Sequence, residues 1–189
     1  MRKHLRNALI AVFVGFALVA PSCALGSPTI KGPTLRPTLT HPLLNLVASI
    51  FAQRTATVEC PSPEAWAKDP FAKGTAGYTW LGENTAYIDP KLCDAALDLN
   101  NTTISQADRA FAVLVIVHES YHIRIWDLAG NEAAVECRAI RHWAVGAALL
   151  GASPETIVAL RPFAIAEHWS IAARYPQYYT RNCHVPPLR

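Results

Sequence analysis

The sequence predicts an α+β fold that is mainly α, and three observations lead to that prediction. The chain has 189 residues, of which 51% are hydrophobic and 16% are charged, a size and composition that suit one folded domain. Three long apolar segments in the C-terminal half each begin with a residue type that caps helices. Two short segments near the middle alternate around a turn, as the strands of a β-hairpin do. We therefore expect helices to surround a small β-structure.

The first 26 residues have the pattern of a secretory signal peptide. Three basic residues precede an apolar run over 8–20, and small residues follow at 24–26. The run has 13 residues, fewer than the ~20 that a bilayer-spanning helix needs. We therefore expect an exported protein, secreted or in the cell envelope of a bacterium, without a stable membrane span after signal removal. Acylation of Cys23, as in a lipoprotein, is an alternative that Pro21 makes unfavourable.

The charge of the remaining chain is balanced, because three of the 17 basic residues lie in the first 26 and 14 residues are acidic. Bulk attraction to nucleic acid or to an anionic membrane is therefore not expected. Residues 27–42 contain four prolines and several threonines and are expected to form an extended linker. This leaves 43–189 as a single domain.

Short elements are expected in the first half of that domain. They are an amphipathic helix over 43–53, a strand over 57–60, a helix over 63–68 capped by Ser62, a hairpin with strands 78–81 and 85–88, and a helix from Pro90 to about Asp98.

Three longer helices are expected in the second half. The first begins at the capping residue Ser105 and runs to about Asp127. Its apolar stretch 111–117 would also suit a buried strand, but the cap and the length favour a helix. Asn131 caps the second helix, over 132–150. The third runs over 154–174, and Pro162 is expected to kink or restart it.

Four cysteines remain once Cys23 is removed with the signal peptide. An even number in an exported protein predicts two disulfides. Three pairings are possible, and we favour Cys60–Cys93 with Cys137–Cys183, because each pair then stays within one half of the chain. A cysteine zinc site is not expected, since no Cys-x-x-Cys spacing occurs.

Residues 118–122 form a His-Glu-x-x-His motif, which predicts a metal-binding site. Positions four apart on a helix lie on one side of it, so His118 and His122 can bind the same metal ion. Glu119 can then reach a water at an open position of that ion and act as general base. The alternative is an ion-paired histidine and a core histidine on an ordinary helix.

Two acidic residues follow on the next expected helix. Glu132 and Glu136 are also four apart, so both face the same way. A hydrolytic zinc site needs a third protein ligand and an open position. One glutamate can be that ligand, and the other can accept a hydrogen bond from a ligating imidazole.

The motif at 118–122 followed by Asn-Glu-Ala-Ala-Val-Glu at 131–136 resembles the thermolysin-type and related zinc peptidases called gluzincins. It also resembles small secreted bacterial proteins of uncharacterised function that have a cysteine directly after the second acid. The resemblance implies a compact zincin-like core with an active-site helix, a glutamate-bearing helix and a small hairpin. It assigns Glu132 as third ligand and Glu136 as its supporting acid.

The spacing leaves two parts of this site open. Only nine residues separate His122 from Glu132, so Glu136 remains an alternative ligand if the first long helix continues far beyond His122. The residue that stabilises the oxyanion is not identified by any motif. Its candidates are His142, His168 and Tyr175.

The resulting hypothesis is an exported peptidase that holds one Zn²⁺ per chain and cleaves a peptide or protein substrate. The expected hairpin can offer an edge strand to which an extended substrate adds. A non-catalytic exported domain, which binds zinc for stability or contacts a cell-surface partner, is the alternative. It would be marked by a closed site with four protein ligands. A zinc hydrolase of another amide or ester is a third hypothesis.

Overall fold

The structure is a computed structural model that describes residues 38–80, 82–124, 131–185 and 187. The predicted signal peptide over 1–26, Cys23 within it and most of the predicted linker lie outside the described residues. The elements, in chain order, are β1 (Thr38–Thr40), α2 (Pro42–Ala52), β2 (Thr57–Pro61), α3 (Pro63–Lys68), β3 (Gly77–Thr79), β4 (Thr85–Ile88), α4 (Pro90–Leu97), α5 (Gln106–Arg124), α6 (Glu132–Leu149), α7 (Pro154–Arg174) and the 3-10 helix η3 (Pro176–Tyr178). The fold is α+β and mainly α, as the sequence predicts.

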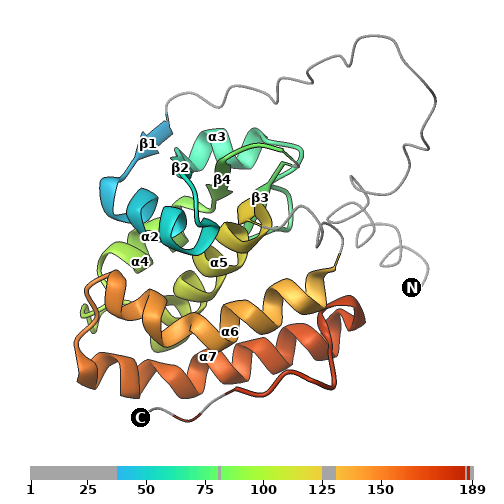
Figure 1. Cartoon of the computed structure of the whole chain (residues 1–189). Coiled ribbons are helices and arrows are strands. Elements are labelled where there is room, and N and C mark those ends of the chain that lie inside the picture. The colour runs from blue at the N-terminus through green and yellow to red at the C-terminus, as the bar shows by residue number, and fades with distance from the viewer. Residues whose placement is uncertain (1–37, 81, 125–130, 186, 188–189) are drawn as a thin grey trace, which may run out of the picture.

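The small sheet and the helices α6 and α7 lie on opposite sides of α5 (Figure 1). Its strand order is β1-β2-β4-β3. The predicted hairpin is confirmed, because β3 and β4 pair antiparallel, while β2 and β4 pair parallel. Strand β3 is therefore an outer strand of the sheet.

The predicted linker over 27–42 is wrong at its C-terminal end. Thr38–Thr40 form β1, which pairs antiparallel with β2, and α2 already begins at Pro42. Two threonines in this short segment suit a strand, and the pairing partner lies about 20 residues later in the chain. Local composition therefore could not reveal the contact, and the domain begins by Thr38.

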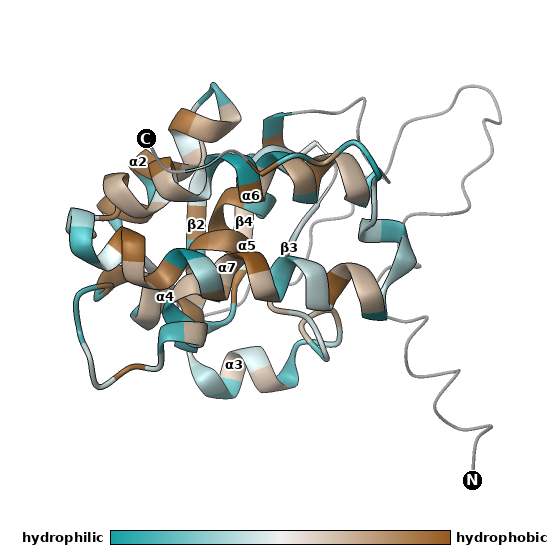
Figure 2. Cartoon of the chain, turned by 90° about the horizontal axis from the view of Figure 1, so that it is seen from below, coloured by the Kyte–Doolittle hydropathy of each residue, from teal (hydrophilic) through white to brown (hydrophobic). Residues whose placement is uncertain are grey.

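Helix α5 forms the centre of the molecule and packs against α2, α4, α6, α7 and the strands β3 and β4. Its apolar stretch is helical rather than extended, and nearly every residue of α5 from Arg109 onward is buried. In Figure 2 its ribbon is largely apolar and lies among the other elements. Trp143 of α6 donates a hydrogen bond from its indole nitrogen to the carbonyl of Ala110, at 2.8 Å, which fixes α6 on α5.

The starts of α6 and α7 follow the predicted caps. The Asn131 side chain accepts from the backbone of Ala134 at 3.1 Å, and Ser153 accepts from the backbone of Thr156 at 3.2 Å. Helix α7 continues through Pro162 as one element, so this proline does not restart the helix. The predicted end of the α5 helix near Asp127 lies outside the described residues.

Both predicted disulfides are present. Cys60–Cys93 joins β2 to α4, and Cys137–Cys183 joins α6 to the tail that follows η3. Disulfides are compatible with an extracellular protein. Within the described ranges, none of the helices has the length and apolar character that crossing a membrane requires.

Candidate metal centre

Three side chains, two from the central helix α5 and one from α6, converge on one point. Nε2 of His118 and Nε2 of His122 lie 3.0 Å apart, and each lies 3.3 Å from Oε2 of Glu132. Together the three offer ligand atoms within 4.8 Å of one another. This group could hold a metal ion.

Local structure explains the convergence. His118 and His122 are one turn apart on α5, so their rings project to the same side. Helix α6 begins at Glu132, directly after its cap, Asn131. Glu132 therefore stands in the first turn of α6, at the level of the two imidazoles.

The distances and the donor set fit a tetrahedral ion. Ligand atoms ~2.0–2.1 Å from zinc, at tetrahedral angles, are ~3.3 Å apart. Both distances to Glu132 match this value, and the distance between the imidazole nitrogens is only slightly shorter. Oε2 of Glu132 is also buried and has no hydrogen-bond partner among the described residues. A cation between these atoms would supply the missing partner.

Glu136 lies one turn further along α6 than Glu132, and it contacts the other ring nitrogen of His118. Its Oε2 lies 2.9 Å from Nδ1 of His118, the nitrogen opposite the one that faces Glu132. Its Oε1 lies 3.0 Å from Nδ1 of His168 on α7. All three side chains are almost completely buried. A proton on Nδ1 of His118 leaves a lone pair on Nε2, which is the form that binds a metal.

Charge within this cluster shifts its pKa values. Burial disfavours a charged imidazole at His118, but the carboxylates of Glu132 and Glu136 outweigh it and raise the pKa of His118 well above 6.5. Burial likewise disfavours charged carboxylates, but the facing histidines hold the pKa values of Glu132 and Glu136 below the usual range. The carboxylates thus remain charged and available to a cation.

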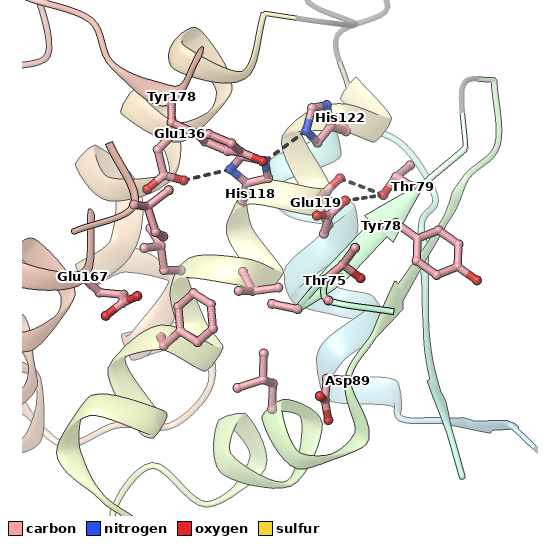
Figure 3. A pocket seen from close by; sticks show the side chains of 18 of the residues that line it. Thr75, Tyr78, Thr79, Asp89, His118, Glu119, His122, Glu136, Glu167 and Tyr178 are labelled. Atoms are coloured by element: carbon pink, nitrogen blue, oxygen red, sulfur yellow. Dashed lines mark hydrogen bonds and ion pairs between the residues drawn. The ribbon is translucent and has the colours of Figure 1, made fainter. Parts of the chain in front are cut away.

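Glu119 is buried beside these residues. The hydroxyl of Thr79 donates to Oε2 of Glu119 at 3.0 Å (Figure 3). Thr79 pairs in register with the buried Ala86, and side chains alternate along a strand, so Thr79 faces α5 while Tyr78 faces away. Sequence reasoning did not identify Thr79, although this alternation in the predicted hairpin could have done so.

Tyr178 was also not identified from the sequence. Its ring lies over His118, with centroids 5.8 Å apart, and its side chain is buried. Burial, the charges of Glu132, Glu119 and Glu136, and a hydrogen bond to Glu132 raise the pKa of Tyr178 far above its usual value. The hydroxyl therefore stays protonated and is a hydrogen-bond donor at the site.

The three sequence-based candidates for the oxyanion residue lie in different places. His142 contacts the hydroxyl of Tyr121 at 2.9 Å, and His168 contacts Glu136. Neither lines the cavity at the candidate centre, whereas Tyr175 does. Tyr178, three residues later, also lines the cavity, and its ring contacts the ring of His118.

This cavity has a volume of about 1290 Å³ and reaches the two histidines, Glu119 and Glu132. It extends past β3, α4, α5 and α7, and Figure 3 shows His118, Glu119 and Thr79 at one end and Asp89 at the other. The candidate centre therefore adjoins a space large enough for a ligand.

Comparison of the chain with protein-family models, with curated proteins and with solved structures finds no match.

Proposed function

We propose that the protein is a zinc-dependent peptidase. The observation that carries the proposal is the meeting of His118, His122 and Glu132 around one point, with the carboxylate of Glu119 beside them in an open cavity. Two histidines and a glutamate form a common protein ligand set of hydrolytic zinc. The likeness of the motif to gluzincins supports the same assignment.

His118, His122 and Glu132 would hold the zinc ion. When bound, the ion would lower the pKa of a coordinated water to ~7 and polarise a substrate carbonyl. Glu136 would support the site rather than bind the ion, because its two oxygens already face His118 and His168. The arrangement therefore leaves a fourth position for water, which favours a hydrolase over a closed structural site.

Glu119 would act as the general base. Its carboxylate takes a proton from the attacking water as the oxygen adds to the carbonyl carbon. The same proton then passes to the leaving nitrogen as the carbon–nitrogen bond breaks, which yields a carboxylic acid and an amine. The hydrogen bond from Thr79 holds the carboxylate of Glu119 in place for both transfers.

Tyr178 would stabilise the negative charge that develops on the carbonyl oxygen. Its hydroxyl is protonated and buried, and it lies beside Glu132 and His118. A preorganised hydrogen-bond donor stabilises an oxyanion strongly.

Strand β3 would position the substrate. It is an outer strand of the sheet, its three residues line the cavity, and Thr79 contacts Glu119. An extended peptide can add to such an edge by main-chain hydrogen bonds. The scissile carbonyl would then lie close to the candidate metal centre.

The test uses the mature, disulfide-bonded protein. We expect about one zinc per chain by elemental analysis and cleavage of a broad peptide library by mass spectrometry. The variant Glu119→Gln should keep the zinc and lose hydrolysis. Glu64→Gln, which alters an exposed carboxylate on α3, is the matched control. Equal cleavage by wild type and Glu119→Gln would overturn the proposal, as would zinc-loaded wild type that cleaves no peptide.

A further inference from the structure

We infer that five aromatic side chains and three carboxylates on the outer side of the small sheet form a surface that binds arginine side chains of another polypeptide. The five rings, which we call the aromatic surface, belong to Trp66, Phe71, Tyr78, Trp80 and Tyr87. The carboxylates belong to Glu59, Asp69 and Glu83. The inference does not depend on the proposed peptidase function, because it concerns the side of the sheet that faces away from α5.

The register of the sheet brings one carboxylate and two phenol rings into a row. Glu59 of β2 pairs with Tyr87 of β4, and Tyr87 pairs with Tyr78 of β3. Val58 and Ala86, which precede Glu59 and Tyr87, are buried, so the row points to the opposite face of the sheet. Figure 3 shows the Tyr78 side chain directed away from the candidate metal centre. The carboxylate of Glu59 and the ring of Tyr87 are therefore neighbours on this outer face.

The five rings contact one another and remain partly exposed. Tyr78 lies at the centre, and its ring stacks with those of Tyr87 and Trp66, at centroid distances of 4.9 and 6.0 Å. Trp80 packs edge-on against Phe71, at 4.6 Å, and against Tyr78, at 5.9 Å. Phe71 is 44% exposed, and none of the other four is buried. Joined aromatic rings that stay accessible in this way mark a binding face rather than a core.

The charges that act on these rings are negative. Burial and the charges of the three carboxylates raise the pKa of Tyr87 to about 12. Burial and the charge of Glu83 also raise the pKa of Glu59, so these two carboxylates repel each other. Among the described residues, none of the three carboxylates forms an ion pair with lysine or arginine. A bound cation would relieve the repulsion, whereas a neutral sugar, which also stacks on aromatic rings, would not.

Two lysines lie close by in the sequence but do not neutralise the carboxylates. Lys68 is in the last turn of α3, and its charge acts on Glu64. Lys73 is exposed in the segment between α3 and β3. Residues 59–87 contain four acidic residues and these two lysines, which gives this segment a net charge of −2. The surface is therefore complementary to a positively charged partner.

A guanidinium group fits this combination better than an ammonium group does. It is planar, so it can stack on an aromatic ring while its N–H groups donate to a carboxylate. Tyr87 and Glu59 offer a ring and a carboxylate side by side. An ammonium group is a compact, strongly hydrated charge that cannot stack. Because arginine is carried by polypeptides, the partner is a polypeptide segment with several arginines.

The aromatic surface meets the cavity at the candidate metal centre but is not part of it. Phe71, Tyr78 and Trp80 also line the cavity, whereas Trp66, Tyr87 and the three carboxylates do not. Charged side chains at the cavity wall, such as Asp94 and Lys91, belong to α4 instead. Variants of residues that lie outside the cavity can therefore distinguish the two places.

The first experiment measures binding of a defined peptide. The probe is an acetylated and amidated peptide with three arginines separated by glycines, titrated by calorimetry into the mature Glu119→Gln protein, which lacks the proposed general base. A second peptide carries citrulline, which has nearly the shape of arginine without its charge. We expect the citrulline peptide to bind at least tenfold more weakly and a lysine peptide to lie between the two. Equal affinities for arginine and citrulline, or no binding of the arginine peptide at millimolar concentration, would overturn the inference.

Variants of the full protein locate the binding. Glu59→Gln and Tyr87→Leu should each weaken binding of the arginine peptide roughly three- to tenfold, while Tyr87→Phe, which keeps the ring, should retain the affinity. Glu59→Gln keeps the test valid if Tyr87→Leu does not fold. Asp94→Asn, which alters an exposed carboxylate at the cavity wall, is the matched control and should leave the affinity unchanged. Equal losses in Asp94→Asn and Glu59→Gln would place the peptide in the cavity and overturn the inference.

A neutral oligosaccharide tests the other ligand class that aromatic rings bind. We expect no binding of cellohexaose, and we expect binding of the arginine peptide to weaken as salt is raised, because ion pairing is screened. Suppose instead that cellohexaose binds, that Trp80→Leu abolishes this binding and that Glu59→Gln does not. The surface would then recognise carbohydrate, and the inference would be wrong.

Discussion

Nδ1 of His118 lies 2.9 Å from Oε2 of Glu136, and this contact ties the central helix to α6 directly behind the candidate metal centre. Glu136 continues the connection to His168 on α7 through its other oxygen, at 3.0 Å. Three helices therefore meet at one buried carboxylate. The orientation of the imidazole that faces Glu132 depends on a residue that does not itself reach the candidate metal position.

Replacing Glu136 should weaken metal binding without removing it. In Glu136→Gln one of the two histidines would face an amide NH₂ group instead of an acceptor, so the ring of His118 would lose its orientation. We expect zinc affinity to fall roughly 10- to 100-fold, as is usual for partners of ligating histidines. Competition with a chromophoric chelator measures this, with Glu64→Gln as control. Complete loss of zinc in a folded Glu136→Gln protein, with zinc retained in Glu132→Gln, would exchange the roles of the two glutamates.

The stability of the metal-free protein should depend on pH in a defined window. The raised pKa of His118 stabilises the folded state at low pH, and this contribution is lost as the pH rises through that value. The lowered pKa values of Glu132 and Glu136 stabilise the folded state above about pH 4.5, and this stabilisation is lost in acid. We expect the greatest stability between about pH 4.5 and about pH 6.5, with a decline as the pH rises from 6.5 through the raised pKa of His118.

Urea unfolding from pH 4 to 9, with a chelator or with added zinc, measures this dependence. Zinc should remove the alkaline decline, because the ion takes the place of the proton between the ligands. A metal-free protein whose unfolding free energy stays constant from pH 6 to 9 would contradict the assignment.

Thr79→Val should slow the reaction and leave the metal in place. Valine has nearly the shape of threonine but cannot donate a hydrogen bond to Glu119, so the general base would lose the contact that positions it. We expect kcat to fall about tenfold. Steady-state kinetics and zinc content together measure this. Thr85→Val, on the other face of the sheet, should leave kcat unchanged, and a normal kcat in Thr79→Val would exclude the positioning role.

Tyr178→Phe should lower kcat much more than it changes KM. The variant keeps the ring over His118 but removes the hydroxyl, so the proposed oxyanion donor and the hydrogen bond to Glu132 are both lost. We expect a decrease in kcat of about 10²-fold with full zinc content. Tyr179→Phe, at an exposed neighbouring position, is the control. If Tyr178→Phe and Tyr179→Phe have the same kcat, Tyr178 is not the oxyanion donor.

Gly146→Ala should destabilise the fold, although alanine favours helices more than glycine does. A Cβ atom at this position of α6 would lie 2.6 Å from Cγ2 of Val117 on α5. The two helices would have to separate, and overpacking of this kind costs about 1–3 kcal/mol. Chemical denaturation measures the change in unfolding free energy, with Val145→Ala at an exposed neighbouring position as control. A gain in stability would show that the helices can absorb the methyl group.

The elements that could be predicted are those with local signals. Caps such as Ser62 and Asn131 mark helix starts, and both disulfides follow from the distribution of cysteines along the chain. Helical spacing predicts that His118 and His122 face the same point, whereas the choice of Glu132 over Glu136 as the third member of the group came from the resemblance to gluzincins. The caps and the pairing of the two histidines depend on residues a few positions apart, whereas the disulfides join cysteines 33 and 46 positions apart.

The features that could not be predicted depend on distant parts of the chain. Strand β1 exists because it pairs with β2, and Thr79 meets Glu119 across 40 residues. Tyr178 reaches the site because the chain turns back after α7, and no local pattern encodes that return. The pairing of Cys183 with Cys137 was the one available indication that the tail lies near α6.

The disulfide Cys137–Cys183 also distinguishes two parts of the site, one that depends on it and one that does not. The three candidate ligands belong to α5 and α6, so they need no cysteine to come together. Tyr178 and Tyr175 belong to the segment that Cys183 fastens next to Glu136. A chain with reduced thiols would therefore be expected to capture the ion yet leave its surroundings incomplete, so the redox state of two cysteines outside the ligand set would decide whether the site is whole.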